Sequence, residues 1–456
     1  MRKQLFYVVL FLLPALINFS CKKDVSCDGC AGNKKSPIAN AGSDQITTLP
    51  KDSVLLDGSA SSDPDGTITA YSWTKIAGPS SFNIVNASAV KTVVKNLIAG
   101  TYQIELKVTD DKGASAKDTV QIIVDAACDN SIRPQINAQL IPIGTLSTAK
   151  SGRAVASAGN KIVFAGGSGG SDCPECWGSS RVDIYDIITQ TWSTAELSKG
   201  RFGISAIASG NKIFFAGGEA GDGAFDQLFS TVDIYDVSTN TWSVAGLSEP
   251  RSNIAAATVG NKVFFAGGEK DWDYNTSNRV DIYNTETNAW STSQLSEARS
   301  YISAVTVNQK IYFAGGHNED RWYRSPSNKI DIYDNATNSW STSSLSIPMG
   351  FIGGITVADK IYWSSGCTVE IKNVNTWNSS MEHLFKPGAG QPVLKDNKIL
   401  FLRTWENPNK FDVYDIATNT WSIGVLPQTI SESASFISVN NTVYVAHGSK
   451  VYKLEF

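Results

Sequence analysis

Charged residues are scarce in this 456-residue chain, and neither sign dominates. Lysine and arginine together number 39 against 43 acidic residues, which leaves a charged fraction of 18% and a formal net charge of -4. A protein that holds nucleic acid needs a clustered basic surface, which this balance does not supply. We therefore expect no nucleic-acid partner.

Long amphipathic helical patterns are also missing, and so is a nucleotide-binding loop. The stretch "NKIFFAGGEAGDG" (residues 211–223) reads as a buried strand followed by a glycine-rich loop, but no Gly-Lys-Ser/Thr and no helix follow it. What the chain does contain is abundant glycine (37 residues), 10% aromatic residues and short alternating strand patterns. These features predict an all-β protein.

The first twenty residues have the pattern of an export signal. Arg2 and Lys3 precede an apolar run over residues 5–17, which is too short to span a bilayer comfortably. Ser20 followed by Cys21 resembles a relaxed lipobox of bacterial lipoproteins, and "CKKD" is similar to the mature start of Bacteroidetes-type lipoproteins. The resemblance implies lipidation of Cys21, a membrane anchor, a location at the outer membrane or cell surface, and a flexible tether over residues 21–36. A plain secretory signal is the alternative.

Six further cysteines lie beyond Cys21. An exported protein favours disulfides over zinc, so we expect local disulfides or free thiols. They are Cys27, Cys30, Cys128, Cys173, Cys176 and Cys367.

Residues 37–125 predict a small β-sandwich. "AGTYQIELKVTDDKGASAKDTVQIIV" (residues 99–124) reads as a hairpin with alternating apolar residues. Together with "LDGSASSDPDG" and the strand residue Trp73, it closely resembles a polycystic-kidney-disease (PKD) domain, which implies an immunoglobulin-like fold and a spacer or adhesive role. No cofactor is expected, although four loop carboxylates leave calcium open beside a simple role in turns: Asp57, Asp63, Asp65 and Asp110.

After a linker over residues 126–136, the chain repeats itself. An apolar phrase ending in Gly-Gly starts at Asn160, Asn211, Asn261 and Gln309, with looser copies at Asp359, Asn397 and Asn441. A phrase of the type "VDIYD" and then a tryptophan follow most copies. A period near fifty residues built of short strands predicts a β-propeller over residues 137–456. The pattern resembles kelch repeats, and seven blades are expected, with residues 137–154 supplying the strand that closes the last one.

One face of this propeller is the expected ligand site. Its candidates are arginines that begin inner strands, which could hold anionic groups, and residues of the loops after Gly-Gly. A hydrogen bond between blades is the alternative role of the arginines, and packing of neighbouring loops that of the tryptophans. The candidates are Arg153, Arg201, Arg251, Arg299, Trp177, Trp272, Tyr274, His317, Trp322, Tyr323 and Trp405.

The resulting hypothesis is a membrane-anchored surface lipoprotein whose propeller binds a glycan or protein partner, with the PKD domain as spacer. The alternative is a sugar mutarotase, epimerase or other glycan-active enzyme, in which Glu219 or Glu269 would act with His317. Kelch-like copper oxidases need a histidine, tyrosine and cysteine motif that this chain lacks; its only histidines are His317, His383 and His447.

Overall fold

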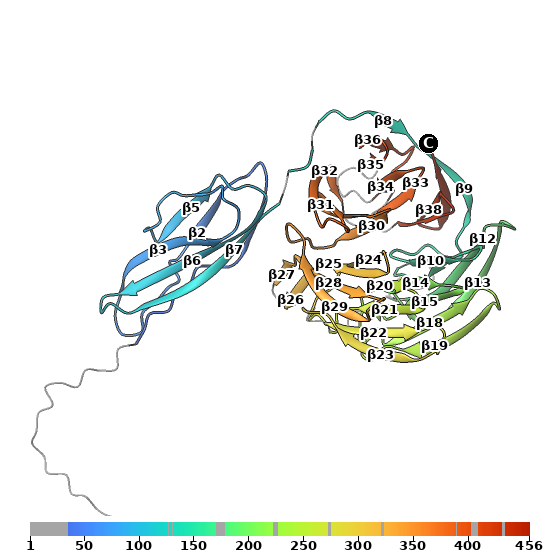
Figure 1. Ribbon diagram of the computed structural model, residues 1–456, viewed down its shortest axis with the longest axis horizontal. Helices are drawn as coiled ribbons and strands as arrows, with labels where there is room; N and C mark the ends of the chain where they lie inside the picture. Colours follow the sequence, from blue (N-terminus) through green and yellow to red (C-terminus); the bar gives the residue numbers. More distant parts are fainter. Residues whose placement is uncertain are drawn as a thin grey trace, which may run out of the picture.

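The computed structural model describes residues 35–125, 127–129, 131–169, 178–221, 227–271, 275–320, 323–388, 390–402, 409–430 and 434–456. Every regular element in these ranges is a β-strand, and the strands form a sandwich followed by a ring of sheets (Figure 1). The all-β prediction, with a sandwich before a propeller, is confirmed. Across these same ranges, no helix has the length and apolar character needed to cross a bilayer.

The sandwich consists of two sheets around one core. One sheet has the order β1 (Gln45–Thr48), β7 (Ser115–Asp125), β6 (Gly100–Asp110) and β3 (Ile68–Ala77); the other has β2 (Val54–Asp57), β5 (Lys91–Lys95) and β4 (Asn83–Ile84). Alternate residues of β6 are buried, as expected for a strand with one face on a core. Trp73 is buried among them, and its indole Nε1 donates a 2.9 Å hydrogen bond to the Ala89 carbonyl.

The propeller sheets follow in chain order, and we number them as blades. Blade 1 contains β10 (Ala154–Ala158), β11 (Lys161–Ala165), β12 (Ser179–Asp186) and β13 (Thr191–Arg201). Blade 2 contains β14 (Ser205–Ser209), β15 (Lys212–Ala216), β18 (Thr231–Asp236) and β19 (Thr241–Gly246). Blade 3 contains β20 (Ala255–Val259), β21 (Lys262–Ala266), β22 (Arg279–Asn284) and β23 (Trp290–Gln294). Blade 4 contains β24 (Ser303–Val307), β25 (Lys310–Ala314), β28 (Lys329–Asp334) and β29 (Ser339–Ser344).

Three more sheets complete the described part of the ring. Blade 5 contains β30 (Gly353–Val357), β31 (Lys360–Asn373) and β32 (Ser379–Gly388). Blade 6 contains β33 (Val393–Lys395), β34 (Lys398–Phe401), β35 (Lys410–Asp415), β36 (Thr420–Val425) and β8 (Gln135–Asn137). Blade 7 contains β37 (Ser435–Val439), β38 (Thr442–His447), β39 (Lys450–Glu455) and β9 (Gln139–Thr145). Two short hairpins, β16 (Glu219–Ala220) with β17 (Gln227–Leu228) and β26 (His317–Asp320) with β27 (Tyr323–Pro326), extend from blades 2 and 4.

The repeated phrases build the blades as their residue types require. In β15, the residues Ile213 to Ala216 are all fully buried, because neighbouring blades cover both faces of the strand. The inner strands of blades 1–3 are rich in alanine, which suits the crowding near the axis. The repeat tryptophan packs on the repeat tyrosine of the same blade, with ring centroids 4.8 Å apart for Tyr235 and Trp242.

Blade 5 departs from the others because β31 doubles back on itself. Its first part pairs with β30 and its second part with β32. The Val374 amide donates a 2.9 Å hydrogen bond to the Asp359 carbonyl, so the two ends of β31 lie side by side. Gly366, with a φ of 55°, lies in the tight turn between the two parts. Blade 5 therefore lacks the long loop that blades 1–4 insert at this place.

Strands from before blade 1 complete the last two blades. β9 pairs antiparallel with β39, and β8 adds a parallel fifth strand to β36. Each pairing joins the start of the propeller to its end, and β9 covers the edge that β39 would otherwise expose.

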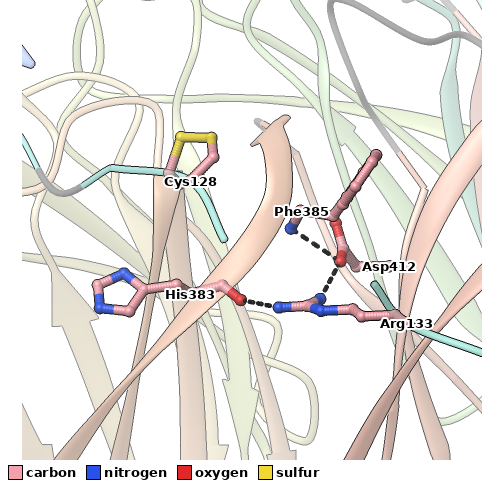
Figure 2. The surroundings of a disulfide bond; sticks show 6 residues. Cys128, Arg133, His383, Phe385 and Asp412 are labelled. Atoms are coloured by element: carbon pink, nitrogen blue, oxygen red, sulfur yellow. Dashed lines mark hydrogen bonds and ion pairs between the residues drawn. A yellow bond between two sulfur atoms is a disulfide. The ribbon is translucent and has the colours of Figure 1, made fainter. Parts of the chain in front are cut away.

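The linker is fastened to blades 5 and 6 rather than lying free (Figure 2). Cys128 forms a disulfide with Cys367 of β31, at a sequence separation of 239 residues. The Arg133 guanidinium pairs at 2.5 Å with Asp412 of β35 and donates a 2.6 Å hydrogen bond to the His383 carbonyl. It also lies 4.9 Å from the ring of Trp421.

This disulfide corrects the expectation of local pairing, because Cys128 lies in the linker and Cys367 lies in blade 5, 239 residues later. Cys27, Cys30, Cys173 and Cys176 lie outside the described residues. Asp129 also binds Arg133, at 2.7 Å, and hydrogen bonds from Arg133 and the Ser131 amide lower the pKa of Asp129 to about 2.

Candidate ligand site on the propeller face

The predicted ligand-binding arginines of blades 2–4 are buried inside the blades. Arg201, Arg251 and Arg299 have 0% exposure. Each donates to an aspartate on the third strand of the blade it leads into: Asp233 at 2.7 Å, Asp281 and Asp331. The prediction that these guanidinium groups face a ligand is wrong, because no part of them reaches the surface. They play the alternative role instead, because they join neighbouring segments of the propeller through ion pairs and hydrogen bonds.

The same aspartates also bind the backbone of the preceding crossover. The Oδ1 atoms of Asp233, Asp281 and Asp331 accept hydrogen bonds of 2.8–3.0 Å from the amides of Ser198, Ser248 and Ser296, respectively. Burial lowers the pKa of all three arginines, while the neighbouring aspartates oppose this change. Each aspartate carboxylate therefore binds both the backbone of the crossover before its blade and the guanidinium group of the arginine.

Arg153 does not belong to this series. The backbone bridge between Ser151 and Ser168 corresponds to that between Phe202 and Glu219, so Lys150 occupies the place of Arg201. Arg153 donates to the carbonyls of Thr148, Lys150 and Gly448, and the last of these bonds, 3.1 Å long, crosses to blade 7. Burial lowers the pKa of Arg153 to about 10. It is 9% exposed, so this predicted ligand contact is also corrected.

Two positions in each of blades 2–4, and the first of them in blade 5, converge on one face, next to the buried arginines. The first is the residue two places after the arginine position, and the second is the residue after Gly-Gly. In blades 3 and 4 they lie beside each other, because Ser252 exchanges backbone hydrogen bonds with Glu269, and Ser300 with His317. We call the resulting set the crescent; it comprises Glu219, Asn253, Glu269, Tyr301, His317 and Phe351.

Three crescent residues have a left-handed backbone. Asn253, Tyr301 and Phe351 have φ angles of 52°, 52° and 47°, whereas blade 2 has Gly203 at this position. A non-glycine residue held there costs on the order of 1 kcal/mol or more. Tyrosine and phenylalanine gain nothing from this conformation themselves, so the strain points to a use for their side chains.

The acidic half of the crescent is formed by blades 2 and 3. Glu269 is only 4% exposed; its Oε2 atom accepts a 2.7 Å hydrogen bond from Asn253 Nδ2, and its Oε1 atom has no hydrogen-bond partner. A methyl group placed on Gly203 would lie 3.3 Å from Glu219 Oε1 and 3.7 Å from Asn253 Oδ1. Glu219 and Asn253 therefore approach the backbone of Gly203 closely, where a side chain would crowd them.

The aromatic half is formed by blades 4 and 5. The ring centroids of Tyr301 and Phe351 are 4.7 Å apart, and that of His317 lies 4.5 Å from Phe351. His317 is 6% exposed and fills the space left by Gly350, where a Cβ atom would lie 2.0 Å from the imidazole Nε2. The sequence prediction for His317 thus identified one member of this cluster.

Asn253, Tyr301 and Phe351 were missed by the sequence analysis. The signal was nevertheless present, because this position reads Gly, Asn, Tyr and Phe in blades 2–5, whereas an isoleucine follows it every time. Five predicted loop residues lie outside the described residues: Trp177, Trp272, Tyr274, Trp322 and Trp405. For Tyr323, only the backbone is described, and it lies in β27.

Three of the four carboxylates considered for calcium have other partners, whereas Asp63 Oδ2 is buried without a hydrogen-bond partner. Asp57 binds Lys91 at 2.6 Å, and Asp65 binds Lys112 at 2.7 Å. Asp110 Oδ1 accepts hydrogen bonds from the amides of Lys112 and Ala114, as in a turn. Within the described part of the chain, no three histidine, cysteine, aspartate or glutamate residues form a group suited to a metal ion.

Comparisons with known proteins agree with this architecture. Residues 41–124 match a PKD-domain family, and residues 203–378 match the KLHDC2/KLHL20/DRC7 Kelch-repeats domain. The chain therefore contains a PKD domain and, after it, a kelch-repeat region. The kelch match covers the blades that carry the crescent.

Relatives of known sequence match the PKD part. The dyslexia-associated protein KIAA0319 homolog of Rattus norvegicus is 37% identical over 23% of this chain and 10% of its own length. Low-density lipoprotein receptor-related protein 11 of Homo sapiens is 35% identical over 19% of this chain and 17% of its own. The matched segments thus span less than a fifth of these relatives.

Two solved structures are similar to the two parts of the chain. The PKD domain from KIAA 1837 protein is 39% identical, with a TM-score of 0.20, and the match covers 22% of this chain and 95% of that one. The structure of YjhT is 12% identical, with a TM-score of 0.44, and the match covers 68% of this chain and 95% of that one.

Proposed function

We propose that this protein is an exported, membrane-anchored binding protein whose kelch propeller holds a protein or glycan partner at the crescent, with the PKD domain as spacer. A PKD domain joined to a kelch propeller supports a binding role. The observation that carries the choice of site is the left-handed backbone of Asn253, Tyr301 and Phe351. Strain retained at three successive blades keeps these side chains on one face.

Glycine variants separate binding from folding at this site. Replacing Tyr301 or Phe351 with glycine relieves the left-handed backbone and removes a ring from the crescent. The melting temperature should stay the same or rise, while affinity for any partner captured from glycan or peptide arrays should fall by about tenfold or more. The matched control is Phe456→Ala, which removes an exposed aromatic ring beside Lys395.

Unchanged binding in both glycine variants would refute the crescent as the site. If the full chain instead interconverts sugars, with loss of turnover in Glu269→Gln and His317→Ala, the enzyme alternative replaces the binding proposal.

The membrane anchor is tested at Cys21. Replacing Cys21 with serine removes the thiol that lipidation requires, so the protein should move from the membrane to the soluble fraction. Cell fractionation with fatty-acid labelling measures this, and Cys30→Ser serves as a control with the thiol lost elsewhere in the tether. If Cys21→Ser remains membrane-bound and labelled, the anchor lies elsewhere.

A further inference from the structure

The linker is attached to the propeller at two places that differ in kind (Figure 2). The first attachment is covalent, the disulfide between Cys128 and Cys367 of blade 5. The second is the ion pair between Arg133 and Asp412 of blade 6, both of which are buried. Directly after Arg133, β8 pairs with β36 and continues this second attachment. We call the segment between Cys128 and Arg133 the strap.

The strap itself has little hold on the blades. Among its described residues, one hydrogen bond to a blade is present, 2.8 Å long, from the Asp129 amide to the Leu384 carbonyl. Ile132 is fully exposed, so it packs on nothing. The ion pair of Asp129 joins the strap to Arg133 rather than to a blade. A segment held by so few contacts opens locally at little cost, so loss of the disulfide moves the effective attachment back to Arg133.

The position of the attachment sets the length of the hinge before it. The last PKD strand, β7, ends at Asp125, so two residues separate it from Cys128 and seven separate it from Arg133. At roughly 3.5 Å per extended residue, the hinge reaches about 7 Å with the disulfide and about 25 Å without it. Leu49 and Ala99 of the PKD domain line the same pocket as Cys128. The short hinge therefore keeps the PKD domain beside the strap.

The disulfide can be reached from one side. Cys128 is partly exposed and lines a pocket of about 440 Å³, together with Asp129 and His383, whereas Cys367 is only 8% exposed. Thiol–disulfide exchange requires that a thiolate approach one of the two sulfur atoms. Cys128 is therefore the half of the bond that is open to a small thiol.

We propose that the Cys128–Cys367 disulfide is a redox switch that controls the mobility of the PKD domain while the propeller stays closed. A thiolate of an external dithiol attacks Cys128 Sγ, and Cys367 leaves as a thiolate that takes up a proton. The second thiolate of the dithiol then displaces Cys128, which also becomes a thiol, so the dithiol ends as a disulfide. The ring remains closed because β9 still pairs with β39. This switch operates whatever the crescent binds.

Hydrogen exchange measured by mass spectrometry tests the proposal on the purified full chain, oxidised and after dithiothreitol treatment. The Asp129 amide should exchange about tenfold faster or more once the disulfide is reduced. The Ala138 amide, which donates to the Val425 carbonyl in blade 6, should change by less than about twofold. Small-angle scattering of the same samples should show a wider spread of molecular dimensions after reduction.

Two variants separate this bond from the other cysteines. Cys128→Ser should resemble the reduced protein with or without dithiothreitol. Cys30→Ser, the matched control, should keep the Asp129 amide protected until the reductant is added. The proposal is overturned if dithiothreitol leaves the bond intact in the native protein, or if the Asp129 amide stays protected after reduction. Equal loss of protection at Ala138 also overturns it, because the ring would then open with the strap.

Discussion

Replacing Arg251 with alanine should lower the free energy of unfolding by about 3–5 kcal/mol, because it leaves Asp281 buried without a counter-charge. Arg251 has 0% exposure and Asp281 is 2% exposed, so water cannot take over from the lost guanidinium group. Arg251 also donates to the carbonyls of Gly267 and Arg279, which fix the turn after β21 and the start of β22. Chemical denaturation of the purified variants measures the loss.

Two controls identify the cause. Arg181 forms an ion pair with Glu196 in blade 1, where both side chains are well exposed, so Arg181→Ala should cost less than about 1 kcal/mol. The double change of Arg251→Met with Asp281→Leu removes both charges and should recover much of the loss. A stability of Arg251→Ala equal to that of Arg181→Ala would show that the buried pair does not hold the blade.

Replacing Cys128 with serine should lower the free energy of unfolding by about 2–5 kcal/mol, because the disulfide closes a very long loop in the unfolded chain. The cross-link also keeps Arg133 beside Asp412, which is 1% exposed and lies within blade 6. Denaturation of the oxidised proteins measures this effect.

Cys367→Ser and the double variant should match Cys128→Ser, since one bond is lost in every case. Adding reductant should bring the wild-type protein to the same stability and leave the variants unchanged. If the wild-type protein under oxidising conditions is no more stable than the variants, the linker is held by its other contacts alone.

The repeat pattern was sufficient to predict the propeller, but the partners of the arginines required three-dimensional contacts. Arg251 and Asp281 are thirty residues apart, and nothing in their local sequence links them. One hint was available in blade 5, where Met349 takes the place of the arginine and Glu370 that of the aspartate. There the carboxylate has Lys372 at 3.5 Å instead.

The role of Arg133 could not be predicted from sequence. It lies in a short polar segment with no repeat of its own, and its partner Asp412 is 279 residues away. Asp412 occupies the position of the repeat aspartate in blade 6, but its guanidinium partner, Arg133, comes from the linker. Long-range partners of this kind depend on the closed ring, which no local pattern describes.

The crescent was only partly predicted, for a related reason. His317 was found because histidine is rare and follows Gly-Gly, whereas Tyr301 and Phe351 resemble ordinary core aromatics in sequence. The backbone angles show that they stand at a position suited to glycine, which blade 2 fills with Gly203.

The pairing of β9 with β39 has a consequence for the order in which the protein matures. The PKD domain has a core of its own, so it can fold as soon as it emerges from the ribosome. Blade 7 joins residues 139–145 to residues 450–455, so the ring cannot close until nearly all of this sequence has been made. During that interval β9 and the linker must wait unpaired, and the thiol of Cys128 is open to the wrong partner. On the proposed export route, chaperones or thiol isomerases would act in this interval, before the last strand is made.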